Sequence, residues 1–123
     1  MSDAKTILTV DDSVTIREML FAALSDLGYR VLQAVDGIDG LASLRDEEPD
    51  VIVTDINMPR LDGIGFIKHV RKDQRYCGTP ILVLTTESDP DCKARAREAG
   101  ATGWIQKPFD PAKLAEAIRR VTA

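Results

Sequence analysis

The sequence predicts an α/β domain in which a parallel β-sheet is covered by helices on both faces. Short apolar runs alternate with segments of helical periodicity along the chain. Two of these runs, 51–53 and 81–84, are apolar at successive positions, as expected for strands buried on both faces. Acid–proline pairs at 89–90 and 110–111 are typical of helix starts.

Five strands are expected to alternate strictly with five helices. The strands are predicted at 5–10, 30–34, 51–53, 81–84 and around 103–106. The helices are predicted at 13–27, from about 38 to before Pro49, around 66–70, and from the two prolines Pro90 and Pro111 onward. Polar residues in 30–34 favour an edge position for that strand. With right-handed crossovers, these features predict a flavodoxin-like, doubly wound (βα)5 sheet of strand order 2-1-3-4-5.

Length and charge restrict the classes of function. A chain of 123 residues is the size of one domain, so residues 1–123 are expected to form a single unit without an output domain. The net charge of −4 disfavours binding to nucleic acid. The longest apolar run, 19–24, is far too short to span a membrane, and the first residues do not resemble a secretory signal. A cytoplasmic location is therefore expected.

Polar side chains follow four of the predicted strands. Asp11 and Asp12 follow the first strand, Asp55 the third, Thr85 the fourth and Lys107 the fifth. The carboxyl ends of parallel strands meet at one edge of the sheet, where α/β proteins bind ligands. We therefore expect these side chains to gather in one site.

This set of side chains indicates a metal-assisted reaction with phosphate. Three carboxylates about 5 Å apart repel by about 3 kcal/mol per pair at an effective dielectric constant near 20, which one lysine does not cancel. Carboxylates with room for water and phosphoryl oxygens suit Mg²⁺. Asp55 is then a candidate nucleophile, with Mg²⁺ and Lys107 stabilising the phosphoryl charge and Thr85 donating a hydrogen bond.

A set of short motifs resembles the receiver domains of two-component response regulators, most of all the single-domain regulators of chemotaxis. The motifs are Val10-Asp11-Asp12-Ser13, Asp55-Ile56-Asn57-Met58-Pro59, Asp62-Gly63, Thr85 and Lys107-Pro108-Phe109. The resemblance covers roughly residues 5–121.

The resemblance implies a role for each matched residue. It makes Asp55 the phosphoacceptor, and Asp11, Asp12, Asp55 and the Asn57 backbone carbonyl the ligands of Mg²⁺. It also implies that Lys107 contacts the phosphoryl group, that Thr85 and Trp104 act as a switching pair, and that Lys107-Pro108 is a cis peptide. Two residues depart from the family pattern: Trp104 replaces the usual Tyr or Phe, and Thr86 is bulkier than the usual Ala or Gly.

The implied function is a phosphorylation-activated signalling switch rather than a turnover enzyme. A chemotaxis-type histidine kinase is the expected donor, the flagellar motor switch the expected target, and a monomer the expected state. A phosphorelay receiver or a phosphate sink would use the same site. A phosphatase of the haloacid dehalogenase type is disfavoured because Asn57 stands where a second acid is needed. A flavin carrier is disfavoured because Asp11 and Asp12 would repel the flavin phosphate.

The remaining candidate residues are given ordinary structural roles. Cys77 and Cys92 are predicted to be reduced thiols, since neither belongs to a metal or redox motif. His69 is predicted to lie on a helix surface. The basic residues at 93, 95 and 97 are spaced by two, so they are not expected to share one helical face.

Overall fold

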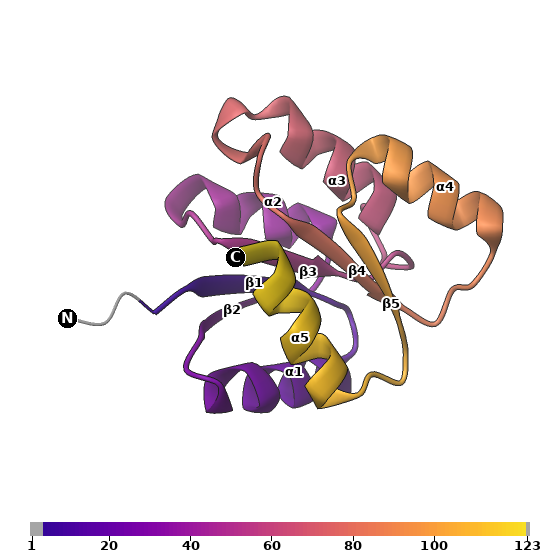
Figure 1. The fold of residues 1–123 in the computed structure, drawn as a ribbon. Helices are drawn as coiled ribbons and strands as arrows, with labels where there is room; N and C mark the ends of the chain where they lie inside the picture. Colours follow the sequence, from indigo (N-terminus) through magenta and orange to yellow (C-terminus); the bar gives the residue numbers. More distant parts are fainter. Residues whose placement is uncertain (1–3, 123) are drawn as a thin grey trace.

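The computed structural model, which describes residues 4–122, contains one five-stranded parallel sheet (Figure 1). The strands are β1 (Thr6–Val10), β2 (Arg30–Ala34), β3 (Val51–Thr54), β4 (Ile81–Thr85) and β5 (Gly103–Gln106). The helices are α1 (Val14–Asp26), α2 (Gly37–Asp46), α3 (Gly63–Lys72), α4 (Pro90–Ala99) and α5 (Pro111–Thr122), with a 3₁₀ turn, η1, at Gln74–Tyr76. The strand order is β2-β1-β3-β4-β5, which confirms the predicted topology.

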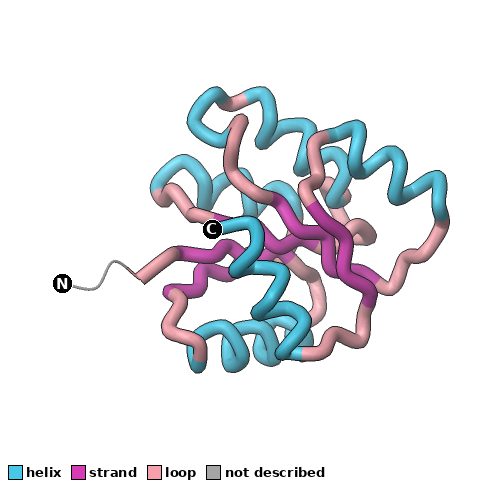
Figure 2. Tube along the Cα trace, viewed as in Figure 1, coloured by secondary structure: helices cyan, strands magenta, loops and turns pink. Residues whose placement is uncertain are grey.

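The helices form two layers, one on each face of the sheet. Figure 2 shows α1 and α5 together on one face and α2, α3 and α4 on the other. Successive strand residues point to opposite faces, so β1 directs Ile7 toward the α1–α5 layer and Leu8 toward the α2–α4 layer. Two apolar cores result. All residues of β3 and β4 are buried, whereas β2 and β5 are partly exposed, as expected for edge strands.

Short polar side chains and proline determine where the helices begin. Ser13 caps α1 by accepting a 3.2 Å hydrogen bond from the Ile16 N–H. Aspartates at 36, 62 and 89 cap α2, α3 and α4 in the same way. Pro90 and Pro111 are the first residues of α4 and α5, which confirms both predicted helix starts.

Arg71, near the end of α3, joins the α3–β4 connection to the α4–β5 connection. Its guanidinium donates to the carbonyls of Tyr76 (2.6 Å), Thr79 (2.7 Å) and Gly100 (2.7 and 3.1 Å). Gly100 closes α4 with φ +121°, and a Cβ there would lie 2.7 Å from the Arg71 side chain. The C-terminal end of α4 is therefore held against α3 by one partly buried arginine.

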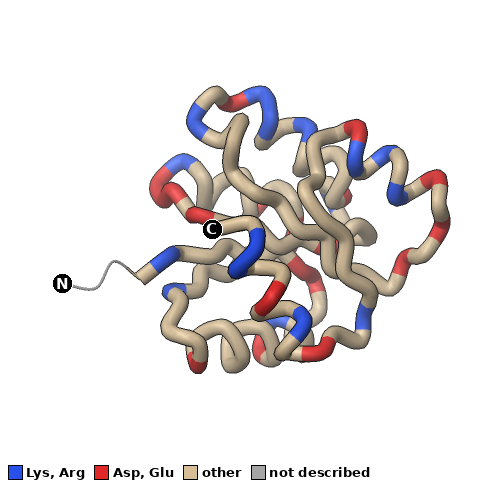
Figure 3. Tube along the Cα trace, in the orientation of Figure 1, with Lys and Arg blue, Asp and Glu red and all other residues tan. Residues whose placement is uncertain are grey.

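The cysteines, His69 and the basic residues of α4 agree with the sequence predictions. Both cysteines are free, and His69 is exposed with Nδ1 2.9 Å from the Gly65 carbonyl oxygen. Figure 3 shows basic residues along α3 and α4 and acidic residues on the loop that enters α4. Lys93 and Arg97 border a hollow beside β5, whereas Arg95 borders a different groove between α3 and α4, so the basic residues of α4 are divided between two faces. No helix within residues 4–122 is long and apolar enough to cross a membrane.

Candidate functional site

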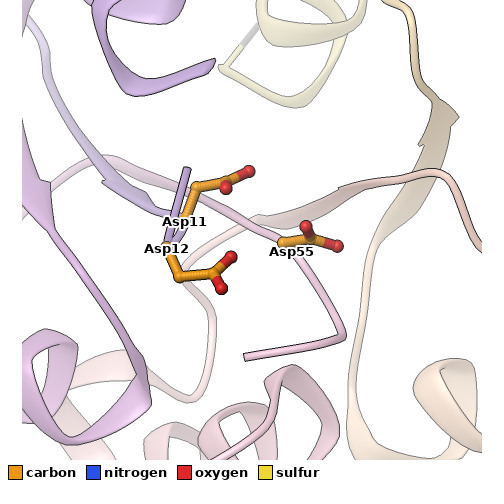
Figure 4. A group of neighbouring side chains, drawn as sticks. All are labelled: Asp11, Asp12 and Asp55. Atoms are coloured by element: carbon orange, nitrogen blue, oxygen red, sulfur yellow. The ribbon is translucent and has the colours of Figure 1, made fainter. Parts of the chain in front are cut away.

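Three carboxylates meet at the carboxyl edge of the sheet. Asp11 and Asp12 follow β1, and Asp55 follows the neighbouring strand β3 (Figure 4). One carboxylate oxygen from each residue lies within 4.8 Å of the other two. Asp11 and Asp55 are buried, with 2% and 8% of their surfaces exposed, while Asp12 is exposed. The sequence prediction that these acids gather in one site is confirmed.

Lys107 lies between the two buried carboxylates. Its ammonium is 2.8 Å from Asp11 Oδ2 and 2.8 Å from Asp55 Oδ2. The Lys107 backbone N–H donates to the Thr85 carbonyl oxygen at 2.8 Å, which extends the pairing of β5 with β4 up to the site. The Lys107–Pro108 peptide bond is cis, as the family resemblance implied. One cation is thus shared by two anions, and it lies 96 residues from Asp11 and 52 residues from Asp55 in the sequence.

Backbone amides hold the other oxygen of each buried carboxylate. Asp11 Oδ1 accepts from the Ser13 N–H at 2.9 Å, and Asp55 Oδ1 accepts from the Ile56 N–H at 2.6 Å. The backbone of Asp11 is fixed as well, because Arg17 donates to its carbonyl oxygen at 2.6 Å. Both carboxylates are therefore oriented before any ligand arrives.

Burial and hydrogen bonding shift the pKa values of Asp11 and Lys107. Burial raises the pKa of Asp11 above its usual value of 3.8, against the lowering effect of the hydrogen bond from Lys107. Burial alone would lower the pKa of Lys107, but its hydrogen bonds to Asp11 and Asp55 outweigh this and raise the pKa. The two directions are compatible, since the ammonium has two anionic partners while the carboxylates share one cation. By composition, the cluster contains three acidic groups and one basic group.

This donor set fits a hard divalent cation. Three carboxylates offer oxygen ligands within a few ångströms, and their repulsion is only partly offset by Lys107. Asp12 is exposed, so the cluster is open to solvent on its side. Asn57, two residues after Asp55, is exposed in the loop that leads to α3. These residues suit Mg²⁺, which is commonly held by one or two carboxylates together with water.

Thr85 and Thr86 lie at the end of β4. Thr85 is fully buried, and its Oγ1 accepts a 3.2 Å hydrogen bond from the Glu87 N–H, which leaves the Thr85 hydroxyl proton available to another acceptor. Thr86 is exposed, and its carbonyl oxygen accepts from the Gln106 side chain at 3.2 Å. The structure thus brings Thr85 to the same edge of the sheet as the carboxylates.

Trp104 lies on β5, which β4 separates from the strands that carry the carboxylates, and it packs toward α4. It pairs in register with Val83 and is partly buried against the core on the α2–α4 side. The Lys93 ammonium is 5.7 Å from the centre of its ring, close enough for a cation–π interaction. Among the residues that the structure describes, its buried indole Nε1 has no hydrogen-bond partner. Trp104 therefore contributes to the β5–α4 surface and not to the carboxylate cluster.

The loop between β3 and α3 contains contacts that the sequence analysis missed. Gly63 passes so close to Asp55 that a Cβ would lie 2.1 Å from the Asp55 carbonyl oxygen, and its N–H donates to the Ile56 carbonyl oxygen at 2.8 Å. Arg60 forms two hydrogen bonds to Asp36 at the start of α2, at 2.7 and 3.0 Å. The motif Asp62-Gly63 could have indicated the close approach, but the sequence contains no local signal for a pair 24 residues apart.

Comparison with known proteins identifies the family. Residues 7–119 match the family model of the response regulator receiver domain. The chain belongs to this family. Receiver domains act in two-component signalling as regulatory phosphoacceptors that receive phosphate from histidine kinases and bind Mg²⁺ in an acidic pocket.

Relatives of this receiver domain include chemotaxis proteins and longer regulators. It is 38% identical over 116 residues to chemotaxis protein CheY-3 of Vibrio cholerae, covering 94% of this chain and 89% of that protein. It is 40% identical over 115 residues to the probable transcriptional regulator ycf27 of Porphyridium aerugineum, covering 94% of this chain and 47% of that protein. The chain thus spans about half the length of the ycf27 relatives that it matches.

Solved structures of receiver domains share this fold. Chemotaxis protein CheY4 of Vibrio cholerae superposes with a TM-score of 0.92 at 45% identity, over 96% of this chain and 98% of that one. The receiver domain of sensor histidine kinase PA1611 from Pseudomonas aeruginosa PAO1 superposes with a TM-score of 0.90 at 29% identity, over 97% and 98%. The PA1611 structure contains a magnesium ion coordinated in the active site cleft.

Proposed function

We propose that this receiver domain is a phosphorylation-activated switch that accepts a phosphoryl group on Asp55 and then changes its affinity for a target protein. The observation that supports this most directly is the cluster of Asp11, Asp12 and Asp55, whose oxygens lie within 4.8 Å and whose two buried members share Lys107. A structural ion pair needs only one carboxylate per lysine. The excess of carboxylates instead suits a cation and a phosphoryl group.

In the proposed reaction, an Asp55 carboxylate oxygen attacks the phosphorus of a phosphohistidine on the kinase. The new O–P bond forms as the P–N bond breaks, and the departing electron pair returns to the imidazole nitrogen. Lys107, already hydrogen-bonded to Asp55, is close enough to donate to a phosphoryl oxygen there. The hydrogen bond from the Ile56 N–H to the other Asp55 oxygen keeps the attacking carboxylate oriented.

Mg²⁺ would be held by Asp11, Asp12, Asp55 and the backbone carbonyl of Asn57. When bound, it supplies positive charge that offsets the carboxylates and the phosphoryl oxygens. The exposed carboxylate of Asp12 suits an incoming cation, whereas the buried carboxylates of Asp11 and Asp55 are oriented in advance by the Ser13 and Ile56 N–H groups.

Thr85 and Trp104 are proposed to pass the change on to the binding surface. The Thr85 hydroxyl can donate to a phosphoryl group on Asp55, and β4 places Val83, two residues before it, in register with Trp104 on β5. Trp104 in turn packs beside Lys93 of α4. Phosphorylation at the sheet edge can therefore alter the surface formed by α4, β5 and α5.

The test is the intact mass of the purified protein after incubation with acetyl phosphate, with and without Mg²⁺. We expect one phosphoryl adduct that requires Mg²⁺ and is absent from Asp55→Asn. The matched control is Asp50→Asn, which changes an exposed aspartate on the opposite edge of the sheet and should retain the adduct. An equal adduct on Asp55→Asn would show that Asp55 is not the acceptor.

The partners are proposed to be a chemotaxis-type histidine kinase and the flagellar motor switch. CheY-3 and CheY4, both chemotaxis proteins, support this reading. Purified motor switch protein should bind the phosphorylated protein more tightly than the Asp55→Asn variant. Equal binding to both would favour a phosphorelay receiver or a phosphate sink, which need the same acceptor but no such target.

A further inference from the structure

Arg60 has an unusual backbone and a side chain with a specific partner. Its φ of +67° makes it the only non-glycine residue with positive φ among residues 4–122. This left-handed conformation costs free energy for any residue with a Cβ, so it persists only where other contacts fix it. The Arg60 guanidinium meets the Asp36 carboxylate with Nε–Oδ2 at 2.7 Å and Nη2–Oδ1 at 3.0 Å. Two parallel hydrogen bonds of this kind fix direction as well as distance.

Asp36 gives this pair a rigid base. Only 4% of Asp36 is exposed, and its Oδ1 also accepts a 2.8 Å hydrogen bond from the Asp39 N–H as the cap of α2. The hydrogen bonds from Arg60 lower the pKa of Asp36 below its usual value of 3.8, which keeps the carboxylate charged. Arg60 is therefore attached to the residue that caps α2.

A second contact joins the same two loops. The Gly37 N–H donates to the Leu61 carbonyl oxygen at 3.2 Å, and a Cβ at Gly37 would lie 2.6 Å from that oxygen. The backbones around Arg60 and Asp36 are thus in direct contact. The Arg60–Asp36 ion pair lies beside this backbone contact, and the Arg60 side chain is 58% exposed to solvent.

The attached loop is the one that carries the proposed site residues. It begins at Asp55, continues through Asn57, and returns to the sheet where the Gly63 N–H donates to the Ile56 carbonyl oxygen. Arg60 lies in the same loop, three residues after Asn57. Because Asn57 itself is exposed, the position of its carbonyl depends on the residues that anchor the loop on either side.

We propose that Arg60 is a positioning residue: its paired hydrogen bonds to Asp36 hold the β3–α3 loop so that the Asn57 carbonyl and the Asp55 carboxylate face one divalent cation. This inference rests on the proposed function, because it assumes that the carboxylate cluster binds Mg²⁺. Outer partners of metal ligands commonly change metal affinity by tenfold or more when they are removed.

Charge and positioning predict opposite results for one substitution. Arg60→Ala removes a positive charge near a cation site and leaves the Asp36 carboxylate without its partner. If Arg60 acted only through its charge, Mg²⁺ would bind more tightly to this variant. If Arg60 holds the loop, Mg²⁺ binds more weakly, by about tenfold.

The experiment is calorimetric titration of MgCl₂ into the full chain, with the thermal midpoint of each variant measured alongside. Arg60→Ala should weaken Mg²⁺ binding. Arg60→Lys should weaken it as well, because lysine keeps the charge but not the planar fork. Asp36→Asn, which keeps a capping oxygen, should weaken it too. The double variant Arg60→Ala/Asp36→Asn should be no weaker than the worse single variant.

Arg75→Ala is the matched control. It removes an exposed arginine–aspartate pair, in which Nη2 of Arg75 on η1 is 2.8 Å from Oδ2 of the capping residue Asp73, and should bind Mg²⁺ like the wild type. Wild-type or tighter binding by a folded Arg60→Ala variant, or additive effects in the double variant, would overturn the proposal. If the wild type itself binds no Mg²⁺, the proposed function and this inference both fail. Normal binding by the wild type together with normal binding by Arg60→Ala would overturn the inference alone.

Discussion

Replacing Gly63 by alanine should damage the site through one backbone contact. Gly63 is the first residue of α3, and an added Cβ would lie 2.1 Å from the Asp55 carbonyl oxygen. Ordinary contact begins near 3.4 Å, so the two atoms must separate by about 1.3 Å. The neighbour is backbone and cannot rotate away. The displacement must therefore move either the Asp55 peptide or the start of α3.

The size of the effect on stability and on rate follows from the contacts of the Asp55 and Ile56 backbone. Overpacking of this kind costs about 1–3 kcal/mol of stability, and the hydrogen bond from the Gly63 N–H to the Ile56 carbonyl oxygen adds about 1 kcal/mol if it breaks. A shift of about 1 Å at a reacting group lowers a rate by about 100-fold. We therefore expect the rate of phosphoryl transfer from acetyl phosphate to fall by about 100-fold even under conditions where the variant remains folded.

The assay is the time course of the phosphoryl adduct by intact mass, at a temperature where circular dichroism shows both proteins folded. Gly78→Ala is the control, because no atom lies within 4 Å of a Cβ placed there and its backbone has ordinary φ. It should phosphorylate at the wild-type rate and keep its stability within about 0.5 kcal/mol. A folded Gly63→Ala protein that phosphorylates as fast as Gly78→Ala would refute the reasoning.

Three further outcomes are expected. Asp12→Asn should raise the free energy of unfolding in Mg²⁺-free buffer by about 1 kcal/mol, because it relieves repulsion at an exposed acid, and urea titration should show that added Mg²⁺ stabilises it less than the wild type. Because the pKa of Asp36 is lower in the folded protein than its ordinary value of 3.8, the ionised carboxylate stabilises the fold fully above pH 3.8. This stabilisation is lost as the pH falls through the folded pKa. Asp36→Asn should therefore lose less stability in acid than the wild type, as measured by urea unfolding on either side of pH 3.8. Arg71→Met should destabilise the protein by about 2–4 kcal/mol in the same assay, because three carbonyls lose their donor, and equal stability to the wild type would contradict this.

The fold was predictable because each element has its own local signal. Continuous apolarity marked β3 and β4 as central strands, and Arg30 and Gln33 marked β2 as an edge. Pro90 and Pro111 fixed two helix starts to the residue. Handedness then restricted the strand order. For the sheet and its helices, the local sequence patterns and the general rules of chain geometry predict the same arrangement.

The carboxylate cluster was predictable because parallel strands bring their carboxyl ends to one edge. That rule places Asp11, Asp55 and Lys107 together without knowledge of any side-chain rotamer. The pair of Arg60 with Asp36 was not predictable in this way, because it depends on the shapes of two loops and on a positive φ at a residue that rarely adopts one. Arg71 was missed for a similar reason, since its partners are carbonyls that any residue supplies.

The attachment of α4 at one end determines how that helix can move. Arg71 holds the Gly100 carbonyl at the C-terminal end, while the N-terminal end follows the loop from Thr85, and the buried side chains of the helix are only Cys92 and Ala96. Ten helical residues span about 15 Å, so a tilt of about 10° around the fixed end displaces the free end by about 2.6 Å. In this geometry, α4 pivots about Gly100. Its largest excursion falls at the end next to the strand that carries Thr85.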